Sequence, residues 1–256
     1  MVDNLIKDPS FLAKIKEISK KENRAFQEVE EEALICLKEL YTERNEVSKV
    51  IGYELMQAII SRGYERKIDV NPAEIKELAK LMRRYSVAFV ITHKTYIDPI
   101  VLTMALARYG MPWPYIFGGI NMSFIGAKQL GKQTGAIFIR RSFKNNEVYK
   151  ACLRHYIAFL IDKGEHFNWA IEGTRSRTGK IVWPKMGILK YIMDSEEESN
   201  RDIKYIPVSI VYDTIPDVKE MTEQGKGKNK KNESLTWMFQ YINKLGEQFG
   251  RAAIRF

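Results

Sequence analysis

Apolar residues recur at steps of three and four positions along the first third of the chain, which predicts helices rather than strands. Over residues 10–62 such positions include Val29 and Ala33, with Glu and Lys residues between them. A further helix is expected to open at Asn71, because Asn is a favoured N-cap and the Pro that follows fits the first helical turn. Residues 1–85 are therefore expected to form an N-terminal helical region.

The pattern changes at residue 86, where short apolar runs rich in β-branched and aromatic residues alternate with helical spacing. This alternation predicts an α/β fold over residues 86–256, with a mixed, largely parallel sheet flanked by helices. The closing RAAIRF has strand character, so we expect the domain to continue beyond Phe256. The expected strands are SVAFVI (86–91), GAIFI (135–139), FNWAI (167–171) and YIPVSIVY (205–212). One helix is expected to begin near Pro99, and three more are expected over about 145–163, 186–194 and 234–248.

One stretch fits neither pattern. Residues 109–127 carry no charge, but two prolines and four glycines disfavour a helix. The stretch is too interrupted to span a bilayer, which takes about 20 apolar residues in one helix. Two interpretations stay open, a buried loop or an exposed apolar surface for lipid or an acyl chain.

Composition adds a preference for anionic partners. The chain has 41 Lys and Arg against 32 Asp and Glu, a net charge of +9. This balance favours nucleic acid, an anionic membrane surface or a phosphorylated substrate without choosing among them. The basic segment GKGKNKKNES (225–234) is expected to be a solvated loop, or else a contact for anionic lipid or nucleic acid. Cys36 and Cys152 lie far apart without metal-ligand spacing, so we expect no disulfide framework, no metal site and a reducing compartment.

Polar segments follow the expected strands, and two of them are rich in arginine. Ligands of α/β domains bind beyond the carboxyl ends of the strands, so these segments are expected to share one rim of the sheet. Arginine suits bidentate capture of phosphate or carboxylate. Arg140 and Arg141 are adjacent, so we expect one to meet the ligand and the other to form an ion pair; a solvated cluster paired with Glu147 and Asp162 is the alternative. The rim residues are His93, Asp98, Arg140, Arg141, Glu172, Arg175, Arg177 and Lys180.

His93 and Asp98, in the segment HKTYID, allow two compatible interpretations. In one, the carboxylate fixes the tautomer of an imidazole that takes a proton from a substrate hydroxyl. In the other, Asp98 is the N-cap of a helix with Pro99 in its first turn. No Ser or Cys stands where it would serve as a nucleophile, which favours direct attack by the substrate hydroxyl. His155 and His166 lack an acidic residue at this spacing and are expected to be structural.

The segment EGTRSRTGK is not a nucleotide-binding P-loop. Gly173 and Gly179 are separated by five residues, and Ile181 stands where that loop needs Ser or Thr. Gly173 is expected to turn the chain sharply or to let backbone N–H groups approach an anion. Glu172 is expected to orient one of the neighbouring arginines, or else simply to neutralise it.

Four segments together resemble a known family. HKTYID, GAIFIRRSF, EGTRSRTGK and IPVSIVYD are similar, in order and spacing, to the four sequence blocks of the glycerol-3-phosphate acyltransferases, particularly the bacterial membrane-associated type. The resemblance implies acyl transfer from acyl-CoA or acyl carrier protein to the sn-1 hydroxyl of glycerol 3-phosphate, giving lysophosphatidic acid. It also implies a peripheral enzyme on the cytoplasmic face of an anionic membrane, with no metal or cofactor. Relatives acting on dihydroxyacetone phosphate or lysophosphatidate remain alternatives.

The resemblance further implies roles for single residues. His93 would deprotonate the acceptor hydroxyl, and Asp98 would hold its imidazole. Lys94, also expected at the substrate, stands where many members carry Arg, which keeps the charge but loses the bidentate fork. Pro207, in the fourth block, is tied to the acyl-donor side or to the structure of the site. The residues tied to glycerol phosphate are Arg140, Arg141, Glu172, Gly173, Arg175 and Ser176.

A basic nucleic-acid-binding module is the alternative from another class of function. The net charge and the basic loop favour it. It leaves His93 and Asp98 without a role, however, and the sequence has no recognised nucleic-acid-binding motif. We therefore expect no nucleic acid among the partners.

Overall fold

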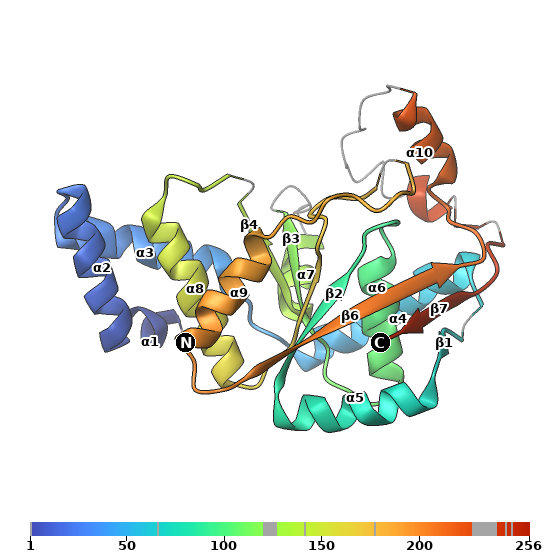
Figure 1. The fold of residues 1–256 in the computed structure, drawn as a ribbon, viewed down its shortest axis with the longest axis horizontal. Coiled ribbons are helices and arrows are strands. Elements are labelled where there is room, and N and C mark those ends of the chain that lie inside the picture. Colours follow the sequence, from blue (N-terminus) through green and yellow to red (C-terminus); the bar gives the residue numbers. More distant parts are fainter. Residues whose placement is uncertain are drawn as a thin grey trace.

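The computed structural model describes residues 2–65, 67–119, 127–140, 142–176, 178–226, 240–243, 245–246 and 248–256. Within these residues, seven strands form one sheet in the order β1-β7-β6-β2-β5-β3-β4 (Figure 1). Neighbouring strands are parallel except β6 and β7, which are antiparallel. The mixed, largely parallel sheet expected from the sequence is confirmed. The strands are β1 (Asp69–Val70), β2 (Ser86–Ile91), β3 (Tyr115–Gly119), β4 (Ala136–Ile139), β5 (Phe167–Ala170), β6 (Ile203–Tyr212) and β7 (Ala252–Arg255).

Helices cover both faces of this sheet. The described helices are α1 (Val2–Ile6), α2 (Pro9–Glu22), α3 (Phe26–Leu40), α4 (Glu46–Gly63), α5 (Pro72–Arg84), α6 (Asp98–Arg108), α7 (Ala127–Thr134), α8 (Glu147–Asp162), α9 (Gly187–Glu197) and α10 (Val218–Gly225), of which α10 lies beyond the ends of the strands (Figure 1). In Figure 1, α1, α2, α3, α8 and α9 gather at the left and α4, α5 and α6 at the right. After Ser86, strand β2 is apolar because both of its faces are covered: Ala88 packs into the core of the first group of helices, whereas Val87 and Phe89 pack into that of the second.

The expected helices and strands are mostly found. The pattern over residues 10–62 corresponds to α2, α3 and α4, and α5 begins as expected, with the Asn71 side chain accepting a 3.0 Å hydrogen bond from the N–H of Ala73. The four expected strands are β2, β4, β5 and β6, and the closing RAAIRF contains β7. The expected helix over 234–248 and the basic loop 225–234 lie largely outside the described residues.

The uncharged stretch 109–127 contains a strand that the sequence did not predict. Residues 115–119 form β3, which lies between β4 and β5 and is parallel to both. Neither interpretation of the stretch anticipated this, because Gly118 and Gly119 lower its strand propensity. Residues 120–126 lie outside the described residues. Another unexpected strand, β1, lies within residues 1–85 and pairs with β7.

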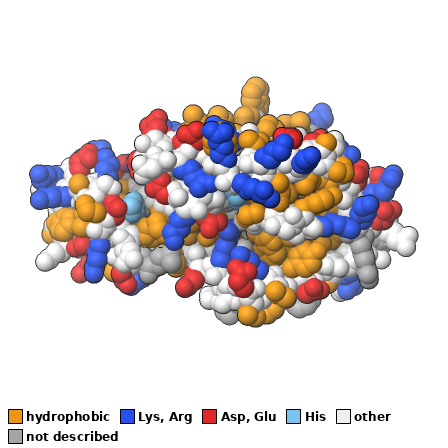
Figure 2. All heavy atoms as spheres, turned by 90° about the horizontal axis from the view of Figure 1, so that it is seen from below, with side chains coloured by type: hydrophobic (Ala, Val, Ile, Leu, Met, Phe, Trp, Pro, Cys, Tyr) orange, Lys and Arg blue, Asp and Glu red, His pale blue; other side chains and the backbone are white. Residues whose placement is uncertain are grey.

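The surface carries both signs of charge. On the face seen from below, acidic and basic side chains are interspersed, with hydrophobic side chains between them (Figure 2). No helix in the described part of the chain is both long and apolar enough to cross a membrane.

Candidate active site

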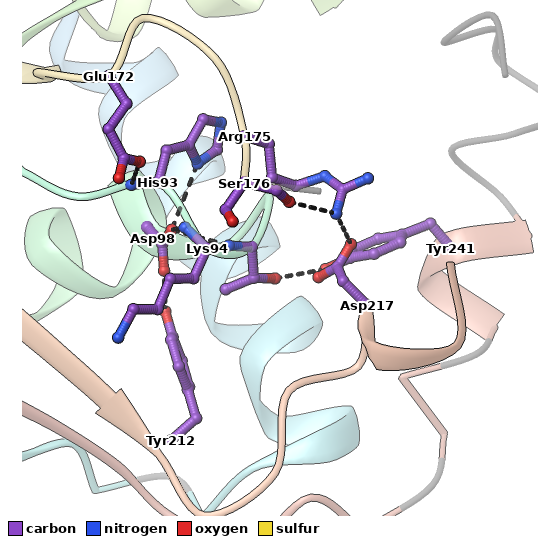
Figure 3. A network of polar contacts seen from close by, with 10 residues as sticks. His93, Lys94, Asp98, Glu172, Arg175, Ser176, Tyr212, Asp217 and Tyr241 are labelled. Carbon is purple, nitrogen blue, oxygen red and sulfur yellow. Dashed lines mark hydrogen bonds and ion pairs between the residues drawn. The ribbon is translucent and has the colours of Figure 1, made fainter. Parts of the chain in front are cut away.

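The candidate site lies where the adjacent parallel strands β2 and β5 end. Ile91 and Ala170 are partners in register, so the segments that follow them leave the sheet side by side. His93 belongs to the first segment and Glu172 to the second, and the backbone N–H of His93 donates a 3.0 Å hydrogen bond to Glu172 Oε2 (Figure 3). The expectation that these two segments share one rim of the sheet therefore holds.

His93 and Asp98 form a pair. Nδ1 of His93 lies 3.3 Å from Oδ2 of Asp98, as Figure 3 shows. The Asp98 side chain is 2% exposed, whereas that of His93 is 22% exposed. With a proton on Nδ1 donated to the carboxylate, Nε2 carries the lone pair of the imidazole. This arrangement can accept a proton from a bound hydroxyl and stabilise the resulting imidazolium.

Asp98 is fixed by donors from two elements. Its Oδ2 accepts hydrogen bonds from the backbone N–H groups of Lys94 (2.7 Å) and Thr95 (2.9 Å). Its Oδ1 accepts a 2.6 Å hydrogen bond from the hydroxyl of Tyr212, the last residue of β6. Burial, followed by the charge of Asp98, raises the pKa of Tyr212 well above its usual value, so this hydroxyl stays a donor.

The N-cap interpretation of Asp98 was wrong. Asp98 is the first residue of α6, Ile97 occupies the cap position, and no side-chain capping bond is formed there. The carboxylate instead accepts from the preceding loop and from Tyr212. Asp98 still lies in the first turn of α6, where the N-terminal end of the helix interacts favourably with a carboxylate. Pro99 lies in the first turn, as expected.

Among the described residues, Glu172 accepts hydrogen bonds from two loops and forms no ion pair with an arginine. Its side chain is buried, and beside the N–H of His93 it accepts a 3.0 Å hydrogen bond from the N–H of Val182. Ser176 adds a second link, because its N–H donates to the carbonyl of His93 at 2.7 Å. Gly173 makes the turn between them at φ +62°, and a Cβ there would lie 3.0 Å from Cδ of Lys185. The sharp-turn interpretation of Gly173 accounts for this geometry.

Arg175 lies in a buried polar network beside the pair. Its guanidinium is 3.8 Å from Oδ1 of Asp217 and lies over the ring of Tyr96 at 4.9 Å. Oδ2 of Asp217 accepts a 3.2 Å hydrogen bond from the hydroxyl of Tyr241, and that hydroxyl is 3.0 Å from the hydroxyl of Thr95. Burial raises the pKa of Tyr241 far above its usual value, so its hydroxyl also stays protonated. These contacts join the third sequence block to the loop that carries His93.

Arg140 is engaged by a residue that the sequence did not suggest. Its guanidinium binds both carboxylate oxygens of Glu39 in α3, with Nε at 3.0 and 3.1 Å and Nη2 at 2.6 Å. It also lies over the ring of Tyr149, 4.5 Å from the centroid. Arg140 therefore has the structural ion pair that was expected of one of the two adjacent arginines, with Glu39 as partner. Arg141 and Arg177 lie outside the described residues.

Pro207 lies in β6, next to β2, and Lys94 lies in the loop that follows β2. Pro207 is an exposed residue of β6, opposite Val90 of β2. Strand β7 meets β6 only from Ser209 onward, so Pro207 occupies a position where a missing N–H is tolerated. Lys94 contributes its backbone N–H to Asp98, and its side chain is half-buried.

Sequence reasoning missed part of this network. The position of Tyr212 could have been predicted, because it is the last residue of an apolar strand and is followed by an acidic residue. Such a residue lies at the rim of the sheet where the site is expected. Tyr241, Thr95 and Asp217 carried no such signal, because their contacts join distant segments. Among the described residues, no three His, Cys, Asp or Glu side chains are grouped so that they could hold a metal ion.

Comparison with known proteins agrees with the four sequence blocks. The sequence model of the acyltransferase family, described simply as "Acyltransferase", matches residues 73–211, more than half of the chain. The chain belongs to this family. The match spans β2 to β6 and includes His93, Glu172 and Pro207. The expectation of an acyltransferase from the sequence blocks is confirmed.

Named relatives place the chain within this acyltransferase family. It is 37% identical over 198 residues to the proteins named "Putative acyltransferase plsB1" of Mycobacterium bovis and Mycobacterium tuberculosis, covering 77% of this chain and 32% of theirs. It is 34% identical over 207 residues to the glycerol-3-phosphate acyltransferase of Alteromonas mediterranea, covering 80% of this chain and 25% of that protein. The matched region thus spans about a quarter to a third of the length of these relatives.

Proposed function

We propose that this acyltransferase chain moves a fatty acyl group from acyl-CoA or acyl carrier protein to the sn-1 hydroxyl of glycerol 3-phosphate, forming lysophosphatidic acid. The observation that carries the proposal is the His93–Asp98 pair, with Nδ1 of the imidazole 3.3 Å from a buried carboxylate. Membership of the acyltransferase family and the 34% identical glycerol-3-phosphate acyltransferase support the reaction and the acceptor.

In the proposed reaction His93 acts as the general base. Its Nε2 takes the proton of the acceptor hydroxyl as that oxygen attacks the thioester carbonyl. The C–O bond forms, and the tetrahedral intermediate then collapses with cleavage of the C–S bond. The imidazolium, stabilised by Asp98, returns the proton to the departing thiolate. The reaction balances with an acyl ester and a free thiol as products, and we propose that no metal or other cofactor takes part.

Cations near the pair are proposed to bind the acceptor's phosphate. Arg175 and Lys94 belong to the segments that follow β5 and β2, and Arg175 is a planar donor suited to phosphate oxygens. The guanidinium of Arg175 lies 3.8 Å from the carboxylate of Asp217. A bound phosphate would therefore either share Arg175 with this carboxylate or take its place. Arg140 and Arg141, Glu172, Gly173 and Ser176 are proposed to complete the phosphate site directly or through the loop. Pro207 is proposed to shape the acyl-donor side.

Transfer of the acyl group from acyl-CoA to radiolabelled glycerol 3-phosphate in lipid vesicles, followed as label that enters the lipid fraction, tests this proposal. We expect His93→Ala to lower kcat by about 10² to 10⁴-fold, the usual contribution of a general base. Lys80→Ala, on the exposed side of α5 and paired only with Glu77 among the described residues, is the control and should keep full activity. Equal activity of wild type and His93→Ala, with both folded by circular dichroism, would contradict the role of His93.

The same assay separates the alternative acceptors. Dihydroxyacetone phosphate and lysophosphatidate each offer a hydroxyl and a phosphate, so each is offered in place of glycerol 3-phosphate. A higher kcat/KM for either would replace the proposed acceptor and leave the base assignment intact. We further propose that the chain works as a peripheral protein on an anionic membrane, since both the donor's acyl chain and the product favour lipid.

A further inference from the structure

An exposed apolar segment lies beside the candidate site. In residues 181–186, the side chains of Ile181, Trp183 and Met186 are 76%, 89% and 55% exposed, and Val182 is also exposed. Four of the large exposed hydrophobic side chains of the described chain thus fall within six residues. A contiguous apolar surface of this kind marks a binding face, whereas a single exposed apolar residue does not.

The segment is held in place by the same groups that hold His93. The N–H of Val182 donates to Oε1 of Glu172, whose other oxygen accepts from His93. The N–H of Lys185 donates to the carbonyl of Ile171 at 2.7 Å, and the carbonyl of Lys180 accepts from the hydroxyl of Ser176 at 2.7 Å. The backbone is therefore bonded inward at both ends, while the apolar side chains between point into solvent.

The charged side chains of residues 180–186 are both basic, Lys180 and Lys185. Residues 173–193 contain five Lys or Arg residues and no Asp or Glu. Lys180 and Lys185 are exposed, and neither has an ion-pair partner within the described residues. Apolar side chains between unpaired cations match the interface of an anionic bilayer, where headgroups carry the opposite charge.

We propose that residues 180–186 are the segment by which this chain docks on an anionic lipid bilayer. Trp183 and Ile181 enter the interfacial layer, where tryptophan is favoured, and Lys180 and Lys185 contact headgroup phosphates. Because Glu172 accepts hydrogen bonds from both Val182 and His93, docking of this segment also fixes the position of the His93 loop. The inference rests on the proposed function in one respect: docking on a bilayer serves this chain because the proposed acyl donor carries a lipid chain and the proposed product is a lipid.

Sedimentation of the full chain with vesicles tests the inference. We compare phosphatidylcholine vesicles with vesicles containing one part phosphatidylglycerol to three parts phosphatidylcholine. Wild type should bind the anionic vesicles, and the double variant Ile181→Ser, Trp183→Ser should bind at least about tenfold more weakly. Lys180→Ser and Lys185→Ser should each cost about fivefold on anionic vesicles and nothing on neutral ones. Ile35→Ser, which removes an exposed apolar side chain of α3, should bind as wild type.

Several outcomes would overturn the inference. One is unchanged binding of the Ile181→Ser, Trp183→Ser variant. Another is loss of binding with Ile51→Ser instead, since α4 also exposes apolar residues. A third is a wild-type dimer, detected without vesicles by analytical ultracentrifugation, that the double variant abolishes. Acyl transfer is measured separately with a water-soluble short-chain acyl-CoA, which needs no vesicle. Vesicle binding through Trp183 without any transfer would refute the proposed function while leaving the docking segment in place.

Discussion

At the scale of single residues, the site depends on how completely Asp98 is satisfied. Four donors surround its two oxygens: the ring of His93, two backbone N–H groups and the hydroxyl of Tyr212. A buried carboxylate loses its hydration, and these donors replace it. Each donor therefore contributes to the orientation of the carboxylate that holds the imidazole of His93.

Tyr212→Phe is expected to lower kcat about tenfold with little change in KM for glycerol 3-phosphate. The substitution leaves Oδ1 of Asp98 without its 2.6 Å donor, which costs about 1–2 kcal/mol and loosens the carboxylate that holds His93. Steady-state kinetics gives the split between kcat and KM.

The matched control is Tyr64→Phe. Tyr64 also donates a 2.6 Å hydrogen bond, to the carbonyl of Thr214, and its ring lies 5.4 Å from that of Tyr212. The control should lose similar stability and keep its kcat. An equal loss of kcat in both variants would mean that Tyr212 acts only through stability.

At the scale of elements, the segment between β5 and α9 joins the site to the sheet. It contains Glu172, the turn at Gly173, buried Arg175 and the exposed residues 181–186. Most of its fixed contacts are with the loop after β2 and with the end of β5. A change in its backbone is therefore expected to reach His93 directly.

Gly173→Ala is expected to lower the free energy of unfolding by about 1–2 kcal/mol. A left-handed backbone at φ +62° is unfavourable for Ala, and the new Cβ would meet the Lys185 side chain at 3.0 Å. Urea denaturation followed by circular dichroism measures the change.

Gly187→Ala serves as the control for this substitution. Gly187 begins α9, and a Cβ there would meet no atom within 4 Å. This variant should be as stable as wild type or slightly more stable. A loss in Gly187→Ala equal to that in Gly173→Ala would show that the turn carries no special constraint.

At the scale of the whole molecule, a buried histidine couples stability to pH. His166 is nearly inaccessible, and its Nδ1 accepts a 3.1 Å hydrogen bond from the N–H of Val87. Burial, followed by the charges of Arg44 and Arg201, lowers the pKa of His166 from 6.5 to about 4. Between pH 6.5 and about 4, His166 therefore binds a proton in the unfolded chain but not in the folded chain.

The free energy of unfolding is expected to fall as pH drops from about 6.5 to about 4. Within this window the unfolded state binds more protons than the folded state, and His166 alone contributes a loss of about 3 kcal/mol. Urea titrations of wild type and His166→Gln across this range measure it. The variant should have a flatter dependence on pH, and identical slopes would contradict the assignment.

Much of the fold could be predicted from the sequence, but only part of the site. The strand SVAFVI and the helix opening at Asn71 were recognisable because their residues are buried or capped in a regular local pattern. Strand β3 was not recognisable, because its glycines have low strand propensity. It is stabilised by pairing with β4 and β5, which the local sequence of β3 does not reveal. The ion pair of Arg140 with Glu39 and the bond of Tyr212 to Asp98 join residues about a hundred positions apart, which local patterns do not reveal.

The pairing of β7 has a consequence for how the chain folds. Ala253 of β7 pairs with Asp69 of β1, and Ile254 pairs with Ile210 of β6, so one short strand pairs with segments 184 and 44 residues earlier in the chain. During synthesis the edge of β6 at 209–212 stays open until residues 252–255 have left the ribosome. An open strand edge invites pairing with other chains, and contacts so distant in sequence form slowly. Nascent chains that stall before β7 should therefore be the aggregation-prone species and the ones that depend on chaperones.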